Sequence, residues 1–142
     1  MEGEIRMVIP ERVNQVAYYY RTTHMDYGYD KYVEPGKEVL SKRYGKIKKE
    51  EYFFWDEASG VDGSRREFRR LIAEIQEGHI HVVVTRDAVM IARDWQQFFE
   101  FMEVCDKVGV EVVSINENGD AWKQYICAKQ FVKEYLGREQ IL

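Results

Sequence analysis

Four short apolar runs are spaced along the chain, and each has the composition of a buried β-strand. They are rich in Val, Ile, Tyr, Phe and Trp, which are the residue types enriched in strands, and they are too short for buried helices. They lie at residues 15–21, 51–55, 80–84 and 110–115. Nearly continuous apolar runs of this kind predict strands that are covered on both faces, as in a parallel sheet.

The segments that follow these runs have helical periodicity. Predicted helices span residues 37–44, 65–77, 94–108 and 120–136. Ser64 is the expected N-cap of the second helix, with Glu67 as its capping-box partner. Expected stops are the glycines at 45, 78, 109 and 137. Pro35 and Gly36 are expected to break any longer helix in the region 26–49.

The alternation of strands and helices predicts an α/β fold. We expect a three-layer sandwich with a mainly parallel sheet of four to five strands and right-handed crossovers. Such sheets bind ligands beyond the carboxyl ends of their strands. The loops that follow Arg21, Trp55 and Val84 should therefore converge at one rim.

Composition limits the class of protein without naming it. The chain has 142 residues, 45% of them hydrophobic and 32% charged, which fits one globular domain. A net charge of -4 argues against a dedicated basic nucleic-acid arm. The N-terminus is charged throughout and no run approaches 18 apolar residues, so we expect no secretory signal, no membrane span and a cytoplasmic protein. Two isolated cysteines and three scattered histidines predict neither a disulfide framework nor a metal site.

The candidate chemistry lies in the loops at the predicted rim. Arg21 is followed by two threonines, Arg65 follows the second strand, and Arg93 ends the segment after the third. Arginine offers planar bidentate donors, which predicts an anionic ligand such as phosphate. A hydroxyl held among arginines can act as a nucleophile. The spacing fits solvated loop arginines equally well, and it leaves both interpretations open.

The order of these pieces resembles the catalytic domain of the serine recombinases, the resolvase and invertase family, over residues 14–118. The family's first strand ends in Tyr-x-Arg-Val-Ser-Thr, and this chain reads YYRTTH from Tyr19. The family's acidic residue, two variable positions and Ser-Gly correspond to DEASG, residues 56–60. Arg65 opens the next helix, and Arg93 stands 15 residues after Gly78, the family's usual distance to its last motif arginine.

The resemblance implies a reaction and a set of residues for it. In that family a serine attacks a DNA phosphodiester, and strand exchange follows without metal or cofactor. Thr23 corresponds to this nucleophile, and Arg21, Arg65 and Arg93 correspond to arginines that bind the phosphate. Asp56 and Ser59 match supporting polar positions. The implied partners are DNA and a second copy of the chain, with no small-molecule cofactor and no membrane.

The chain departs from the family pattern at three positions of this site. Thr23 replaces the serine and adds a methyl group, which restricts rotation about χ1. The family motif Leu-Asp-Arg-Leu-x-Arg reads AVMIAR over residues 88–93, so Val89 stands for the aspartate and Met90 for the first arginine. The sequence therefore predicts a resolvase-like recombinase domain with a degenerate active site and weak or absent cleavage.

Two alternative functions remain open at this point. The chain is an active recombinase or nickase that uses Thr23, or Ser59 in a changed role, or it is a non-enzymatic assembly protein on the same fold. The second alternative depends on the C-terminal helix, where Trp122, Tyr125, Ile126 and Phe131 form an apolar stripe. We accordingly divide the chain into an N-terminal extension (1–13), the resolvase-like domain (14–118) and a C-terminal oligomerisation helix (119–142).

Overall fold

The centre of the molecule is a sheet of four parallel strands. The computed structural model describes residues 14–22, 32–46, 49–57 and 65–141. The strands are β1 (Gln15–Thr22), β2 (Glu50–Glu57), β3 (Val82–Thr85) and β4 (Glu111–Ser114), in the order β2-β1-β3-β4. In the register of β1 with the edge strand β2, Arg21 lies opposite Asp56. All four predicted strands are confirmed, and their carboxyl ends share one edge of the sheet.

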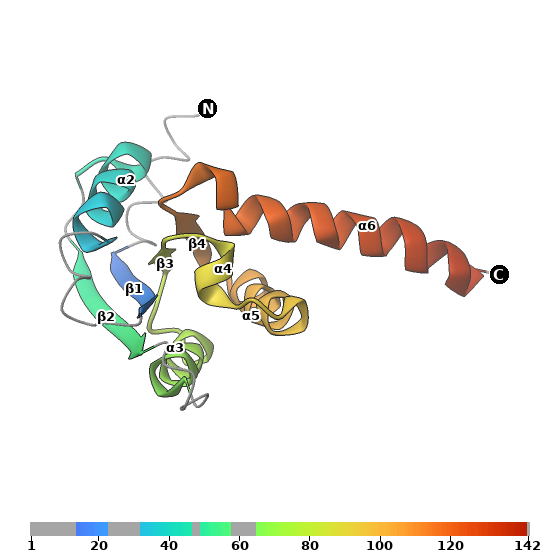
Figure 1. Cartoon of the computed structure of the whole chain (residues 1–142), viewed down its shortest axis with the longest axis horizontal. Helices are drawn as coiled ribbons and strands as arrows, with labels where there is room; N and C mark the ends of the chain where they lie inside the picture. The colour runs from blue at the N-terminus through green and yellow to red at the C-terminus, as the bar shows by residue number, and fades with distance from the viewer. Residues whose placement is uncertain (1–13, 23–31, 47–48, 58–64, 142) are drawn as a thin grey trace.

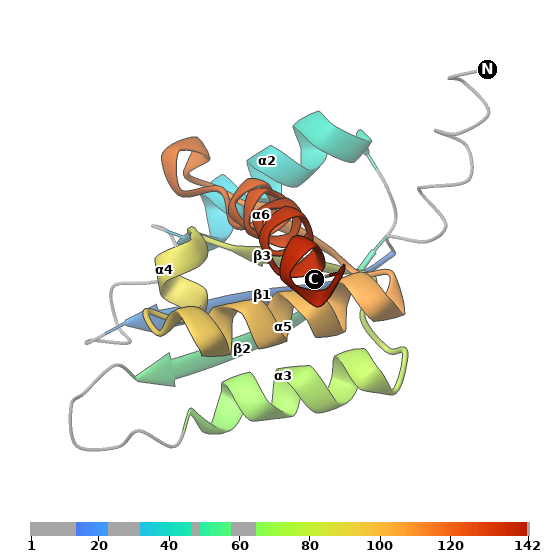
Figure 2. The same cartoon turned by 90° about the vertical axis from the view of Figure 1, so that its right-hand side faces the viewer.

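Helices cover both faces of this sheet and make three layers, as predicted (Figure 1). One face carries α2 (Glu34–Tyr44). The other carries α3 (Arg66–Gln76) and α5 (Trp95–Val108), which lie side by side in both views (Figure 2). A short helix, α4 (Ala88–Ile91), follows β3, and a 3-10 turn (Glu117–Gly119) precedes the long C-terminal helix α6 (Ala121–Ile141).

Strand β1 divides the core into two apolar clusters because its side chains alternate between the faces. Tyr18 and Tyr20 pack on the α2 side, whereas Ala17 and Tyr19 pack on the side of α3 and α5. All three consecutive tyrosines, Tyr18 to Tyr20, are buried. None of these three rings faces solvent, because helices cover both faces of this strand.

Two helices have boundaries that differ from those predicted, and one helix was not predicted. Helix α2 begins at Glu34 and includes Pro35 and Gly36 in its first turn, where proline costs no helical hydrogen bond. Gly36 is required there, because a Cβ would lie 2.9 Å from the Tyr20 hydroxyl oxygen. Helix α6 runs through Gly137 to Ile141. Helix α4 was not predicted, because four residues are too few for a visible period.

Helix α6 contacts the sheet only with its first turns and then extends away from the body of the molecule (Figure 1). Ala121 and Tyr125 join the core. Beyond them Phe131 is 59% exposed and Tyr135 is 61% exposed, and these two rings stack on each other. Across the described residues, the helices are all too short or too polar to cross a lipid bilayer.

Helix α5 contributes four buried residues to the core on its face, and its ends are exposed. Its buried residues are Phe98, Phe101, Met102 and Cys105. Trp95 and Val108 lie at the two ends of the helix and are exposed. Trp95 lines an apolar cavity of about 640 Å³ beside α6, together with Phe131 and Val132.

Candidate functional site

The predicted rim exists, and part of the predicted site is assembled there. Arg21 and Asp56 end β1 and β2 as direct neighbours in the strand register. Directly paired residues of parallel strands point to the same face, so Arg21 and Asp56 share the face of Tyr19, towards α3 and α5. Thr23 and Ser59 lie outside the described residues, as does the predicted N-cap Ser64.

Asp56 connects the sheet to the start of α3. Its Oδ1 accepts a hydrogen bond of 2.9 Å from the backbone N–H of Glu67, and its Oδ2 accepts one of 2.9 Å from that of Phe68. The Tyr19 hydroxyl donates a third, also 2.9 Å long, to Oδ2. A distant strand residue therefore caps this helix, and the buried carboxylate has the partners that it requires.

Arg65 is held by the same network. Its backbone is in the left-handed region, with φ 47°, which is uncommon for a residue other than glycine. Its Nη2 donates to the Tyr19 hydroxyl at 3.0 Å and to the carbonyl oxygen of Ile91, and its guanidinium lies 3.7 Å from the centre of the Phe68 ring. Strained backbone is found preferentially at functional sites, and here it directs a charged side chain into the rim.

Tyr19 was not predicted as a site residue, although it bridges two residues that were. Burial raises the pKa of its phenol above the usual value, so it stays protonated and keeps donating to Asp56. The signal was present in the sequence. Tyr19 precedes Arg21 by two residues, and residues two apart on a strand share a face.

Two buried nitrogens at this rim have no hydrogen-bond partner among the described residues. They are the Nε atoms of Arg21 and Arg65. Buried donors in proteins are nearly always paired, so an acceptor is expected at each of them. Two guanidinium groups on one face suit an anion with several oxygens. Arg93 is exposed two residues beyond α4, and no described contact joins it to Arg21 or Arg65.

Helix α4 presents no charged side chain at the two positions where the resemblance implies one. Met90 is 4% exposed and packs in the cluster of Tyr20 and Val84, on the face opposite Tyr19 and Arg65. Val89 is 53% exposed. The aspartate of this segment is Asp87, which caps α4 by accepting a hydrogen bond from the backbone N–H of Met90 at 3.1 Å. Asp87 also accepts one from Arg86 Nε at 3.0 Å.

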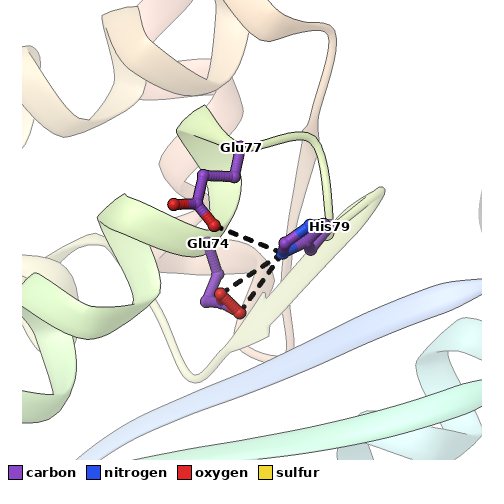
Figure 3. Close-up of side chains that lie close together, drawn as sticks. All are labelled: Glu74, Glu77 and His79. Carbon is purple, nitrogen blue, oxygen red and sulfur yellow. Dashed lines mark hydrogen bonds and ion pairs between the residues drawn. The ribbon is translucent and has the colours of Figure 1, made fainter.

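One group of three potential metal ligands occurs within the described ranges, at the far end of α3 from this rim (Figure 3). His79 Nδ1 lies 3.3 Å from a carboxylate oxygen of Glu74 and 3.6 Å from one of Glu77. His79 is exposed as expected, whereas His81 is half-buried. Gly78 and His79 follow α3 at the amino edge of the sheet, so this group is separate from the candidate site.

Comparison with known proteins agrees with this architecture. The sequence model of the family described as "Resolvase, N terminal domain" matches residues 16–132. No curated protein sequence matches the chain significantly. Among solved structures, the N-terminal catalytic domain of TP901-1 integrase is similar with a TM-score of 0.60 and 19% identity, over 90% of this chain and 99% of that one.

Two further structures have the same fold. The catalytic domain of ISC1926 TnpA, an IS607-like serine recombinase, gives a TM-score of 0.57 at 17% identity, over 87% of this chain and 84% of that one. A resolvase-family site-specific recombinase from Streptococcus pneumoniae gives 0.53 at 18%, over 89% and 93%. The solved structures agree in fold, and the family match, which covers most of the chain, shows that this chain belongs to the resolvase family.

Proposed function

We propose that this chain is a DNA-acting resolvase-type domain that still binds a phosphate but cleaves DNA weakly or not at all. The observation that carries the proposal is the position of Met90. It corresponds to a family arginine, yet its side chain is buried on the face opposite Arg65 and Tyr19. The charge that the family places at the reacting phosphate has therefore left this site altogether.

The remaining residues support phosphate binding. Arg21 and Arg65 lie at the carboxyl edge of the sheet, and each carries a buried Nε for which the described part of the chain offers no hydrogen-bond partner. The network of Tyr19 and Asp56 fixes Arg65 in place, so its guanidinium does not have to be ordered when a ligand binds. A DNA phosphodiester is the anion that the family membership indicates.

The loss of charge is large enough to affect the reaction. Preorganised donors at a transition state contribute about 3 kcal/mol each, which is more than a hundredfold in rate. By the resemblance, the nucleophile is Thr23, whose extra methyl group constrains its approach. Asp56 is not a free base for such a hydroxyl, because both of its oxygens already accept hydrogen bonds.

A trapping assay tests this proposal. The chain is fused to a sequence-specific DNA-binding module and incubated with a nicked duplex that carries the module's sites, so that cleavage leaves a covalent protein–DNA adduct. We expect the parent to give no more adduct than Thr23→Ala, whereas an active resolvase catalytic domain in the same fusion gives a strong band. An adduct that forms in the parent and disappears in Thr23→Ala would establish the alternative, an active recombinase or nickase.

Assembly through α6 is a second candidate function, because that helix exposes apolar surface. Ile126, Phe131, Val132 and Tyr135 are all at least 40% exposed, and Phe131 and Val132 line the cavity beside Trp95. We propose that a second copy of the chain covers this surface. We also propose that the protein is located in the cytoplasm. Sedimentation should show a dimer that Phe131→Ser with Tyr135→Ser dissociates. A parent that is monomeric at every concentration would remove this candidate.

A further inference from the structure

The first two turns of α3 concentrate positive charge next to the candidate site. Residues 65–70 hold four arginines and one glutamate, a net charge of +3, in a chain whose net charge is -4. Arg66, Arg69 and Arg70 are exposed, and Arg65 is half-buried. The positive end of the helix dipole adds to the charge of these side chains. This is a local feature that the overall composition conceals.

Two of the four arginines, Arg65 and Arg70, make contacts that the structure identifies. Arg65 is bound to Tyr19 and to the Ile91 carbonyl. Arg70 is paired with Glu67 at 2.8 Å and lies 4.3 Å from the centre of the Phe54 ring. These contacts account for the positions of the Arg65 and Arg70 side chains.

Arg66 and Arg69 form the solvent-facing pair. They are three residues apart and therefore neighbours on the helix surface. Arg66 makes no hydrogen bond or ion pair with any described residue. Arg69 lines a groove of about 350 Å³ between α3 and α5, and Arg65 lines the same groove. The pair thus begins at the candidate phosphate site and continues away from it along α3.

We infer that Arg66 and Arg69 bind the sugar-phosphate backbone of DNA beside the phosphate held by Arg21 and Arg65. The inference rests on the proposed function, which supplies DNA as the ligand. Arginine forks fit phosphate oxygens, and a duplex presents many phosphates along one line. Exposed arginines that touch no base edge contribute sequence-independent affinity, which places the duplex on the domain without selecting a target.

The salt dependence of DNA binding tests this inference. Binding of the whole chain to a 30-base-pair duplex of mixed sequence is followed by fluorescence anisotropy over a series of salt concentrations. The test variant is Arg66→Gln with Arg69→Gln. The matched control is Lys42→Gln with Lys107→Gln, which removes the same charge from the last turns of α2 and α5, at the opposite edge of the sheet.

The expected result is a change of slope. Each lost phosphate contact lowers the slope of log affinity against log salt by about 0.9, so the arginine variant should lower it by about 2 and the control should leave it unchanged. Arg66→Lys with Arg69→Lys should keep the slope of the parent, because the charge is retained. Equal losses in the lysine and glutamine variants would show a structural role and overturn the inference.

Two other results would overturn it in distinguishable ways. If the parent binds with a strong salt dependence that the arginine variant shares, the inference fails and the proposed function stands. If the parent shows no salt-dependent binding, both fail. Sedimentation measures whether the arginine variant associates with itself differently from the parent. An arginine variant that changes the association of the chain, with an unchanged slope, would show that these arginines meet an acidic surface of a second copy.

Discussion

The hydroxyl of Tyr19 donates a hydrogen bond to Oδ2 of Asp56 across the boundary between β1 and β2. The same carboxylate caps α3, and the same hydroxyl accepts from Arg65. One pair of side chains therefore fixes the sheet, the helix and the candidate phosphate-binding arginine relative to one another. Stability and site geometry are coupled here, and substitutions in this pair should affect both.

Asp56→Ala is expected to destabilise the protein strongly. It leaves two helix N–H groups and the buried Tyr19 hydroxyl without an acceptor, which should lower the free energy of unfolding by about 2 to 4 kcal/mol. Urea unfolding followed by circular dichroism measures the loss. The control is Asp94→Ala, which removes the exposed N-cap of α5 and should cost only about 1 kcal/mol. Equal losses for the two variants would contradict the role given to Asp56.

Arginine at position 90 should not fit the fold that surrounds Met90. Met90→Arg places a guanidinium in an apolar cluster without a partner, and we expect a loss of about 2 to 4 kcal/mol. Val89→Arg is the matched variant at an exposed position and should change stability by less than about 0.5 kcal/mol. If Met90→Arg is as stable as the parent, the segment can rearrange, and the argument from the position of Met90 is weakened.

Gly119 should not tolerate a side chain. A Cβ at this position would lie 2.8 Å from Cβ of Asp87, the residue that caps α4. Gly119→Ala must displace Asp87, and we expect a loss of about 1 to 3 kcal/mol in thermal or urea unfolding. Asn118→Ala, at the exposed neighbouring position, serves as the control and should cost much less. If Gly119→Ala is as stable as the parent, Asp87 can move away from the added methyl group without a loss of stability.

Stability should fall at alkaline pH, in part because of Tyr20. Burial raises the pKa of its phenol well above the value of 10 in the unfolded chain, so the folded state holds the proton more tightly. The stabilisation is complete below pH 10 and decreases above it, by up to about 1.4 kcal/mol per pH unit. In urea unfolding between pH 9 and 12, Tyr20→Phe should show a shallower decline than the parent. If the free energy of unfolding falls equally steeply with pH in the parent and in Tyr20→Phe, the role given to Tyr20 is contradicted.

The sequence predicted the strands better than it predicted the site. Runs such as YFFW and HVVV are typical of strands, and their alternation with periodic segments leaves few topologies apart from the one observed. The helix that begins at Arg65 was also predicted, but its cap was assigned to Ser64 from a local pattern. The described cap is Asp56, because strand register brings a distant carboxylate to that helix end.

The sequence predicted the edge of the sheet at which Arg21, Asp56 and Arg65 lie, but it did not predict the contacts that these residues make. Arg21, Asp56 and Arg65 lie at one edge of the sheet, as the topology required. The bond from Arg65 to the Ile91 carbonyl and the burial of Met90 depend on α4, a helix too short to have a sequence period. The resemblance implies that Met90 stands where the family has an arginine, but the sequence did not predict the face to which its side chain turns.

The central claim is that Arg21 and Arg65 still form a phosphate site that position 90 no longer serves. The measurement that tests it most directly is a crystal structure grown with sulfate and repeated for Arg21→Gln. We expect a sulfate ion within hydrogen-bond distance of both guanidinium groups, Met90 in the cluster with Tyr20, and no ion in the variant. An empty rim at saturating sulfate, or a sulfate bound elsewhere and unaffected by Arg21→Gln, would contradict the claim.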